Sequence, residues 1–114
     1  MNITRTEKPN LLIVKLDGKF DIEQTQNFEK TFSDLLEKKP PRIGMNLTDL
    51  NFIDSSGMGS LIKCLNKTRN YGGEMILFGL KPMLLNVFKL AKLDNFFKVV
   101  TPDEFQKEYL DAEN

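Results

Sequence analysis

Short apolar segments of strand type alternate along this chain with segments whose apolar residues recur at helical spacing. Two strand candidates, residues 3–8 and 11–16, come first, and each later strand candidate is separated from the next by a helix candidate. Parallel strands need crossover connections of this kind, which are usually helices. The pattern therefore predicts one α/β domain over residues 1–114, with a mixed, largely parallel sheet of about five strands and about four helices.

The later strand candidates are residues 43–47, where apolar residues alternate with others, the continuous apolar run at 75–78, and residues 96–100. The second strand is expected to end in a turn at Asp17-Gly18, after which Asp21 caps the first helix in a capping box with Gln24. Thr101 is expected to cap the last helix. The faces expected to be buried are formed by Ile22, Phe28, Phe32, Leu35 and Leu36 in the first helix, Met58, Leu61, Ile62 and Leu65 in the second, and Leu84, Leu85, Phe88 and Ala91 in the third.

The composition excludes several kinds of site. Sixteen basic and sixteen acidic residues cancel, so no overall charge favours nucleic acid or an anionic membrane as a partner. One cysteine and no histidine cannot form a zinc site of the Cys/His type, and no metal or other cofactor is expected. The single cysteine and the lack of a secretory or membrane-spanning segment predict a soluble protein of the cytoplasm.

The segment Asp54-Ser55-Ser56-Gly57-Met58-Gly59 places two hydroxyls and two glycines at the expected start of the second helix. A helix N-terminus presents unpaired N–H groups and the positive end of the helix dipole, so it stabilises an added phosphate. Glycines there let another molecule approach the backbone closely. The simpler alternative is that Ser55 or Ser56 caps the helix and the glycines relieve the turn. The local pattern leaves both interpretations open.

Catalytic interpretations of this segment fail on specific residues. Without histidine the chain lacks the commonest base for activating a serine nucleophile. A hydrolase elbow has the pattern G-x-S-x-G, but no glycine stands two residues before Ser55 or Ser56. A phosphate-binding loop has the pattern G-x-x-x-x-G-K-[ST], and no segment of the chain matches it. The chain is therefore expected not to be an enzyme, and its serines are better candidates for modification by another protein.

Three further features have a structural interpretation that competes with a functional one. The segment at residues 17–21 is either a contact loop beside the serine segment or a turn followed by a helix cap. Asp49 and Asp54 are better explained as loop and cap residues than as a Mg²⁺ site. Cys64 is expected to be a packed thiol, and the acidic stretch at residues 103–113 a solvated helical face.

The segment LTDLNFIDSSGMG, at residues 47–59, resembles the corresponding segment of bacterial anti-sigma-factor antagonists, the single-domain STAS proteins. Three other segments are similar to that family, in order and at family spacing: residues 17–21, 71–75 and 88–97. The resemblance implies the STAS fold over residues 1–114. Lys19, Gly44 and Asn46 depart from the common pattern, and Gly44 is expected to weaken the packing of its strand.

The resemblance implies a function in partner switching. In this family the unmodified antagonist binds an anti-sigma factor, usually a serine kinase with a GHKL-type ATP site, and so releases the sigma factor. The kinase phosphorylates the serine after the aspartate, here Ser55, and a PP2C-type phosphatase restores the unmodified form. The residues implied in partner binding are Asp21, Asp54, Ser55, Ser56, Gly57, Met58 and Gly59. An alternative is a STAS interaction or scaffold domain in another signalling assembly, which does not control a sigma factor.

Overall fold

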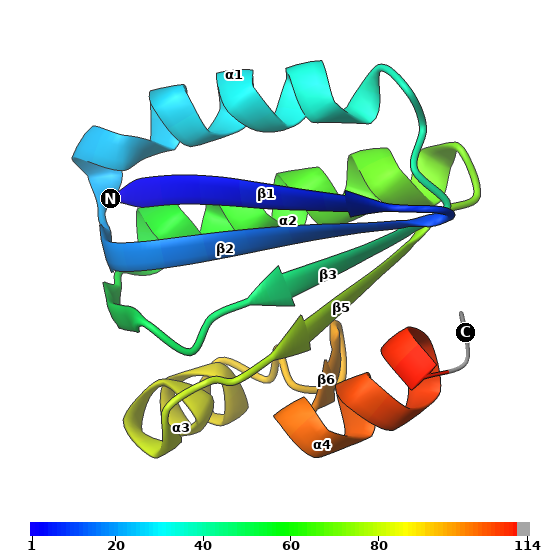
Figure 1. Cartoon of the computed structure of the whole chain (residues 1–114). Helices are drawn as coiled ribbons and strands as arrows, with labels where there is room; N and C mark the ends of the chain where they lie inside the picture. The colour runs from blue at the N-terminus through cyan, green and yellow to red at the C-terminus, as the bar shows by residue number, and fades with distance from the viewer. Residues whose placement is uncertain (112–114) are drawn as a thin grey trace.

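A mostly parallel β-sheet forms the middle layer of the molecule, with helices on both faces (Figure 1). The computed structural model describes residues 1–111. The strands are β1 (Asn2–Lys8), β2 (Leu11–Phe20), β3 (Arg42–Asn46), β4 (Leu50–Ile53), β5 (Glu74–Phe78) and β6 (Lys98–Val100). The helices are α1 (Thr25–Leu36), α2 (Ser55–Asn70), α3 (Pro82–Leu90) and α4 (Pro102–Phe105), with a 3₁₀ turn η1 (Ile22–Gln24) before α1 and a π-type turn η2 (Gln106–Leu110) after α4.

Five strands follow the order β1-β2-β3-β5-β6, and β4 pairs with β2 beside this path. β1 runs antiparallel to β2, and the other strand pairs are parallel. Helices α1 and α2 lie on one face of the sheet and α4 on the other (Figure 1), whereas the buried residues of α3, Leu84 and Phe88, belong to the same core as those of α1 and α2. Strands covered on both faces are expected to be apolar throughout, and in β5 the four residues from Met75 to Phe78 are all buried.

The hydrophobic core is largest where α1 and α2 pack on the sheet. There Phe20, Phe28 and Phe32 form a series of ring contacts, with centroids 4.6 and 5.0 Å apart. A smaller core on the face covered by α4 is built around Phe105, which stacks on Phe78 with ring centroids 4.0 Å apart. The sheet is therefore stabilised from both sides, by residues distant in the sequence.

The predicted fold class is confirmed, but the strands differ in three places from the prediction, the first of which is that β6 begins at Lys98 and not at Phe96. The sequence pattern does not predict β4, a short strand with buried residues only at its two ends. β2 does not end in a turn at Asp17-Gly18 but continues to Phe20. A shift of register between Gly18 and Lys19 replaces the turn, and the φ of 110° at Gly18 is a conformation that suits glycine.

The start of α1 also differs from the prediction. Asp21 is an N-cap as expected, but its carboxylate accepts a hydrogen bond from the N–H of Glu23, and Gln24 completes no capping box. The first turn is a 3₁₀ helix with three residues per turn, so Ile22 does not continue the buried face of α1. Its side chain is 68% exposed, whereas the other four residues predicted for this face are buried.

The structures of α3 and α4 differ less from the prediction than the start of α1 does. Leu84 and Phe88 are buried as predicted, but Ala91 is exposed because α3 ends one residue before it. Thr101 caps α4 in a capping box with Glu104. The acidic stretch after it is not a fully solvated face, because Phe105 and Tyr109 are buried against the sheet. Glu113, at the end of that stretch, lies outside the described residues.

Gly44 does not weaken the packing of its strand. It is buried in β3, and a Cβ atom at this position would lie 2.7 Å from Cε1 of Phe105. Such a distance is shorter than any ordinary contact between carbon atoms, so only glycine lets the ring of Phe105 rest on the strand. The glycine at position 44 is therefore part of the packing of the C-terminal segment.

Candidate functional site

The end of β2 and the end of β4 meet at one edge of the fold, where α2 begins. Lys19 pairs with Phe52 and Phe20 with Ile53. The next residue after β4, Asp54, donates its backbone N–H to the carbonyl oxygen of Phe20, at 3.2 Å. The segment at 17–21 thus lies directly beside the serine segment, as one of its two sequence interpretations required.

Asp54 is the residue that holds the two segments together. It is the N-cap of α2, and its Oδ1 accepts a hydrogen bond from the N–H of Gly57 at 2.9 Å. The other carboxylate oxygen, Oδ2, accepts from the N–H of Ile22 at 3.2 Å. One carboxylate therefore caps α2 and also fixes the turn η1, so the capping residue is Asp54 rather than either serine.

Gly57 lets α2 begin close to β2. A Cβ atom on this buried residue would lie 2.5 Å from the carbonyl oxygen of Phe20 and 2.9 Å from Cγ1 of Ile53. Gly59 differs, because a Cβ atom there would have no atom within 4 Å. The two glycines of the motif are therefore not equivalent: Gly57 is required for close packing, whereas Gly59 leaves open space beside the helix.

Ser55 is the first residue of α2 and is exposed, whereas Ser56 and Met58 are half-buried. Its hydroxyl forms no hydrogen bond with any residue of the described part of the chain. The hydroxyl is thus accessible and lies next to the free N–H groups of the first helical turn. Asp21, which is half-buried, directs its carboxylate to its own turn through Glu23.

Two exposed apolar side chains are close to these residues in the chain, and the sequence pattern indicates neither of them as exposed. Ile22 is 68% exposed and follows Asp21, and Phe52 is 45% exposed and precedes Asp54 by two residues. We call the surface formed by Ile22, Phe52 and Ser55 the serine surface. The sequence gives no signal for Phe52, because β4 is too short to show a period, and nothing in the pattern distinguishes Ile22 from the buried residues of α1.

The N-terminus of α3 lies next to β4 at this end of the molecule. The Nζ atom of Lys81, the N-cap of α3, donates a hydrogen bond to Oδ1 of Asn51 in β4. Met83, in the first turn of the same helix, has a side chain that is 76% exposed. Ile22, Phe52 and Met83, three of the exposed large apolar side chains, thus belong to β4 or to elements that contact it or the residue after it.

The carboxylates of Asp49 and Asp54 have separate partners. Asp49 forms an ion pair with Lys15, at 2.7 Å between Oδ2 and Nζ. Their hydrogen bond and opposite charges lower the pKa of Asp49 and raise the pKa of Lys15. No three potential metal-ligating side chains cluster anywhere in residues 1–111.

None of the helices in the described residues is long and apolar enough to cross a membrane.

Cys64 is a packed thiol in the middle of α2, as predicted. Its side chain is almost completely buried, and this burial raises the pKa of the thiol to about 12. Because the thiolate is the nucleophilic form, this cysteine is inert at neutral pH in the folded protein.

Comparisons with known proteins agree with the observed fold. The family model of the STAS domain matches residues 2–105. BtrV of Bordetella bronchiseptica, a candidate anti-sigma factor antagonist, is 25% identical over 104 residues, which cover 91% of this chain and 90% of BtrV.

Solved structures show the same similarity. A candidate anti-sigma factor antagonist from Thermotoga maritima superposes with a TM-score of 0.84 at 25% identity, over 93% of this chain and 92% of that one. SpoIIAA from Bacillus, solved in its phosphorylated form, has a TM-score of 0.72 at 20% identity, with 99% of this chain and 100% of that chain covered. The match over nearly the whole sequence and the matching topology give one conclusion: this chain belongs to the STAS domain family.

Proposed function

We propose that this protein is an anti-anti-sigma factor whose binding is switched by phosphorylation of Ser55. The unphosphorylated form binds an anti-sigma factor, a serine kinase with a GHKL-type ATP site, and so releases the sigma factor. The kinase phosphorylates Ser55 and the complex separates, after which a PP2C-type phosphatase restores the binding form. The protein is the ligand and the substrate in this cycle, which takes place in the cytoplasm, and the catalysis belongs to its partners.

The observation that carries this proposal is the exposed hydroxyl of Ser55 at the first position of α2, next to a cap that is already provided by Asp54. Because Asp54 caps the helix, the hydroxyl of Ser55 has no structural task in the described part of the chain. A kinase can modify it without breaking an existing hydrogen bond. The half-buried Ser56 is less accessible, which favours Ser55 as the acceptor.

The same geometry explains why modification would change binding but not folding. A phosphate adds about −1.5 to −2 charges at neutral pH. The N-terminus of α2 stabilises negative charge, so the phosphorylated domain keeps its fold. A partner docked on the serine surface, beside Ile22 and Phe52, would instead have to bury that charge against apolar side chains. A loss of about 1.4 kcal/mol in binding free energy already lowers the affinity tenfold.

Phosphorylation by the partner kinase tests the acceptor. The kinase is recovered by pull-down on the unmodified protein, and the purified pair is incubated with ATP and analysed by mass spectrometry. We expect one phosphate on Ser55, no phosphate on the Ser55→Ala variant, and unchanged phosphorylation of the matched Ser56→Ala variant. A phosphate confined to Ser56 or to a residue outside the serine surface would contradict the assignment.

Binding of the charge mimic tests the switch. Ser55→Asp is expected to retain the circular dichroism spectrum of the wild type and to lose at least about tenfold in affinity for the kinase, measured by calorimetry. Ser55→Ala is the control, because it removes the hydroxyl without adding charge, and it should still bind. A Ser55→Asp variant with wild-type affinity would favour the scaffold alternative, in which the partner is bound constitutively.

A further inference from the structure

The outer edge of β1 is open. β1 is the first strand in the sheet order, and no strand within residues 1–111 pairs with its outer edge. All of its residues except Ile3 are exposed. An open edge carries unpaired N–H and C=O groups that can pair with a strand of another chain. The charges along β1 decide which strand it can accept.

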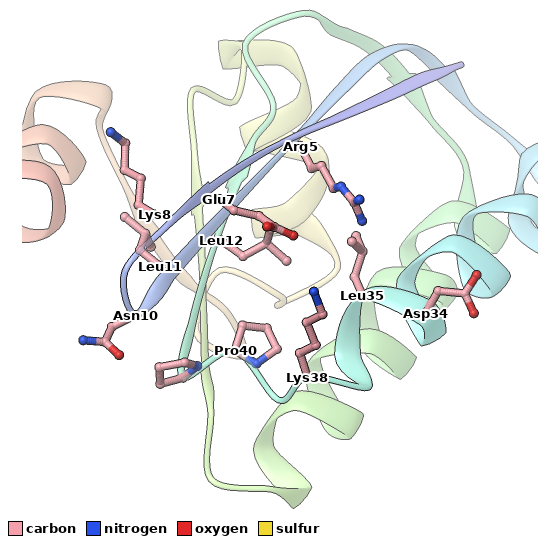
Figure 2. Close-up of a pocket in the computed structure, with 11 residues that line it drawn as sticks. Arg5, Glu7, Lys8, Asn10, Leu11, Leu12, Asp34, Leu35, Lys38 and Pro40 are labelled. Carbon is pink, nitrogen blue, oxygen red and sulfur yellow. The ribbon is translucent and has the colours of Figure 1, made fainter.

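Arg5 and Glu7 share one face of β1, because side chains alternate along a strand. Figure 2 shows both side chains on the side of α1, whereas Lys8 points away from it. Neither Arg5 nor Glu7 forms an ion pair with another residue of the described part. Charges on an edge strand usually prevent pairing, but here the two opposite charges are spaced so that a second copy of the strand can neutralise them.

An antiparallel pair of two β1 strands centred on Thr6 places Arg5 of each copy directly opposite Glu7 of the other. Thr4 then lies opposite Lys8, so no like charges meet. A shift by one residue toward the C-terminus places Arg5 opposite Lys8, and a pair centred on Arg5 places two arginines opposite each other. Like charges directly opposite destabilise a strand pair, whereas opposite charges stabilise it. Only the register centred on Thr6 sets Arg5 against an acidic side chain.

The space beside this edge is not filled by α1. A cavity of about 210 Å³ lies between the β1–β2 hairpin and the C-terminal end of α1, with Arg5, Glu7, Leu35 and Lys38 among its lining residues (Figure 2). A second hollow of about 280 Å³, lined by Ile3, Arg5 and Asp34, lies on the same side of β1. Side chains of a strand added to the edge of β1 would project into these two hollows.

We propose that the protein forms a two-fold symmetric dimer through antiparallel pairing of β1 with β1 of a second copy, in the register centred on Thr6. Two reciprocal pairs between Arg5 and Glu7 fix the register. The proposal rests on the strand edge and not on Ser55, so it stands or fails independently of the proposed function.

Charge reversal tests the dimer by sedimentation velocity over a wide concentration range. Arg5→Glu and Glu7→Arg each set like charges against each other twice, and each should raise the dimer dissociation constant at least about tenfold. The double variant Arg5→Glu/Glu7→Arg has the net charge of the wild type and restores both pairs, so it should dimerise like the wild type. Lys8→Glu changes the charge by the same amount as Arg5→Glu but faces Thr4, and it is the matched control.

Mixing the two single variants gives a stricter test. In the mixture, the two acidic side chains of one variant meet the two basic side chains of the other, so a heterodimer should form although each variant alone is monomeric. Circular dichroism shows whether each variant is folded. Where a single variant is unfolded, the dimerisation of the double variant is compared with that of the wild type instead. A wild type that stays monomeric at the highest concentration, or a double variant that does not regain dimerisation, would overturn the proposal.

Discussion

The carboxylate of Asp54 accepts a hydrogen bond from the backbone N–H of Ile22, at 3.2 Å and 32 residues apart in the sequence. This contact joins the first turn before α1 to the N-cap of α2, and it lies beside the exposed hydroxyl of Ser55. The motif is thus held in place by the aspartate, whereas the serine that follows it stays accessible.

Replacing Asp54 should separate its two tasks. Asp54→Ala removes the helix cap and the contact to Ile22, and we expect a loss of about 2 kcal/mol in the free energy of unfolding. Asp54→Asn keeps an oxygen for the N–H of Gly57 but turns an amide donor toward Ile22, so it should lose about half as much. Urea unfolding measures both variants. An Asp54→Asn variant as stable as the wild type would mean that the contact to Ile22 contributes nothing, and equal losses for the two variants would mean that the cap to Gly57 contributes nothing.

The two glycines of the motif should respond oppositely to alanine. Gly57→Ala forces a Cβ atom against the carbonyl oxygen of Phe20 and should destabilise the domain by about 1–3 kcal/mol. Gly59→Ala meets no atom and replaces a glycine within a helix, so it should stabilise the domain by up to about 1 kcal/mol. Thermal unfolding of the pair gives the comparison. A stable Gly57→Ala variant would show that β2 can move away from α2.

The contact between Gly44 and Phe105 should appear as coupling between the two positions. Gly44→Ala alone should cost about 1–3 kcal/mol, because the ring of Phe105 occupies the place of the new methyl group. In a Phe105→Leu background the same substitution should cost clearly less, since the smaller side chain leaves room. A double-mutant cycle by urea unfolding measures this coupling, and additive effects would argue against close packing of the Phe105 ring on Gly44.

Cys64 should make the stability fall at alkaline pH. Burial raises its pKa from the ordinary 9.0 to about 12, so the folded state keeps the proton that the unfolded state loses. Its contribution is therefore complete below about pH 9 and is lost as the pH rises from about 9 toward 12. Unfolding midpoints at rising pH should fall more steeply for the wild type than for Cys64→Ala, which lacks the titrating group. Parallel curves for the two proteins would contradict this account.

Much of the fold could be predicted because the apolar pattern and the local signals agree. Phe28, Phe32 and Leu35 recur at helical spacing and are buried, and Thr101 and Glu104 form the capping box that their spacing indicates. Such signals involve residues close together in the sequence, where geometry is nearly independent of the rest of the chain.

The missed features depend on distant partners. β4 has too few residues to show a period, and its strand conformation comes from pairing with the end of β2. The burial of Gly44 follows from Phe105, which is 61 residues later in the chain (105 − 44). The exposure of Ile22 follows from the 3₁₀ turn that Asp21 and Asp54 hold in place. None of these relationships can be read from local periodicity.

The motif residues are only partly explained by the sequence. The sequence pattern predicts that Asp54 and Ser55 lie at the start of a helix, but it leaves open whether a serine or the aspartate is the N-cap. In the structure the N-cap is Asp54. The resemblance identified Ser55 as the acceptor, and that assignment stays a prediction until the phosphorylated residue is determined. The neighbouring Ile22 and Phe52 came only from the structure, because their exposure depends on where the paired segments end.

β2 pairs with two different parallel strands along its length. It pairs with β3 over Leu12–Lys15 and with β4 over Gly18–Phe20, with the register shift inside the second region. Substitutions at the exposed residues of β4, Asn51 and Phe52, can therefore change the surface at this end of the molecule without disturbing the register of the central strands. A protein built in this way can diverge in the partner it recognises while its core stays the same, which is how one scaffold could serve many separate signalling pairs.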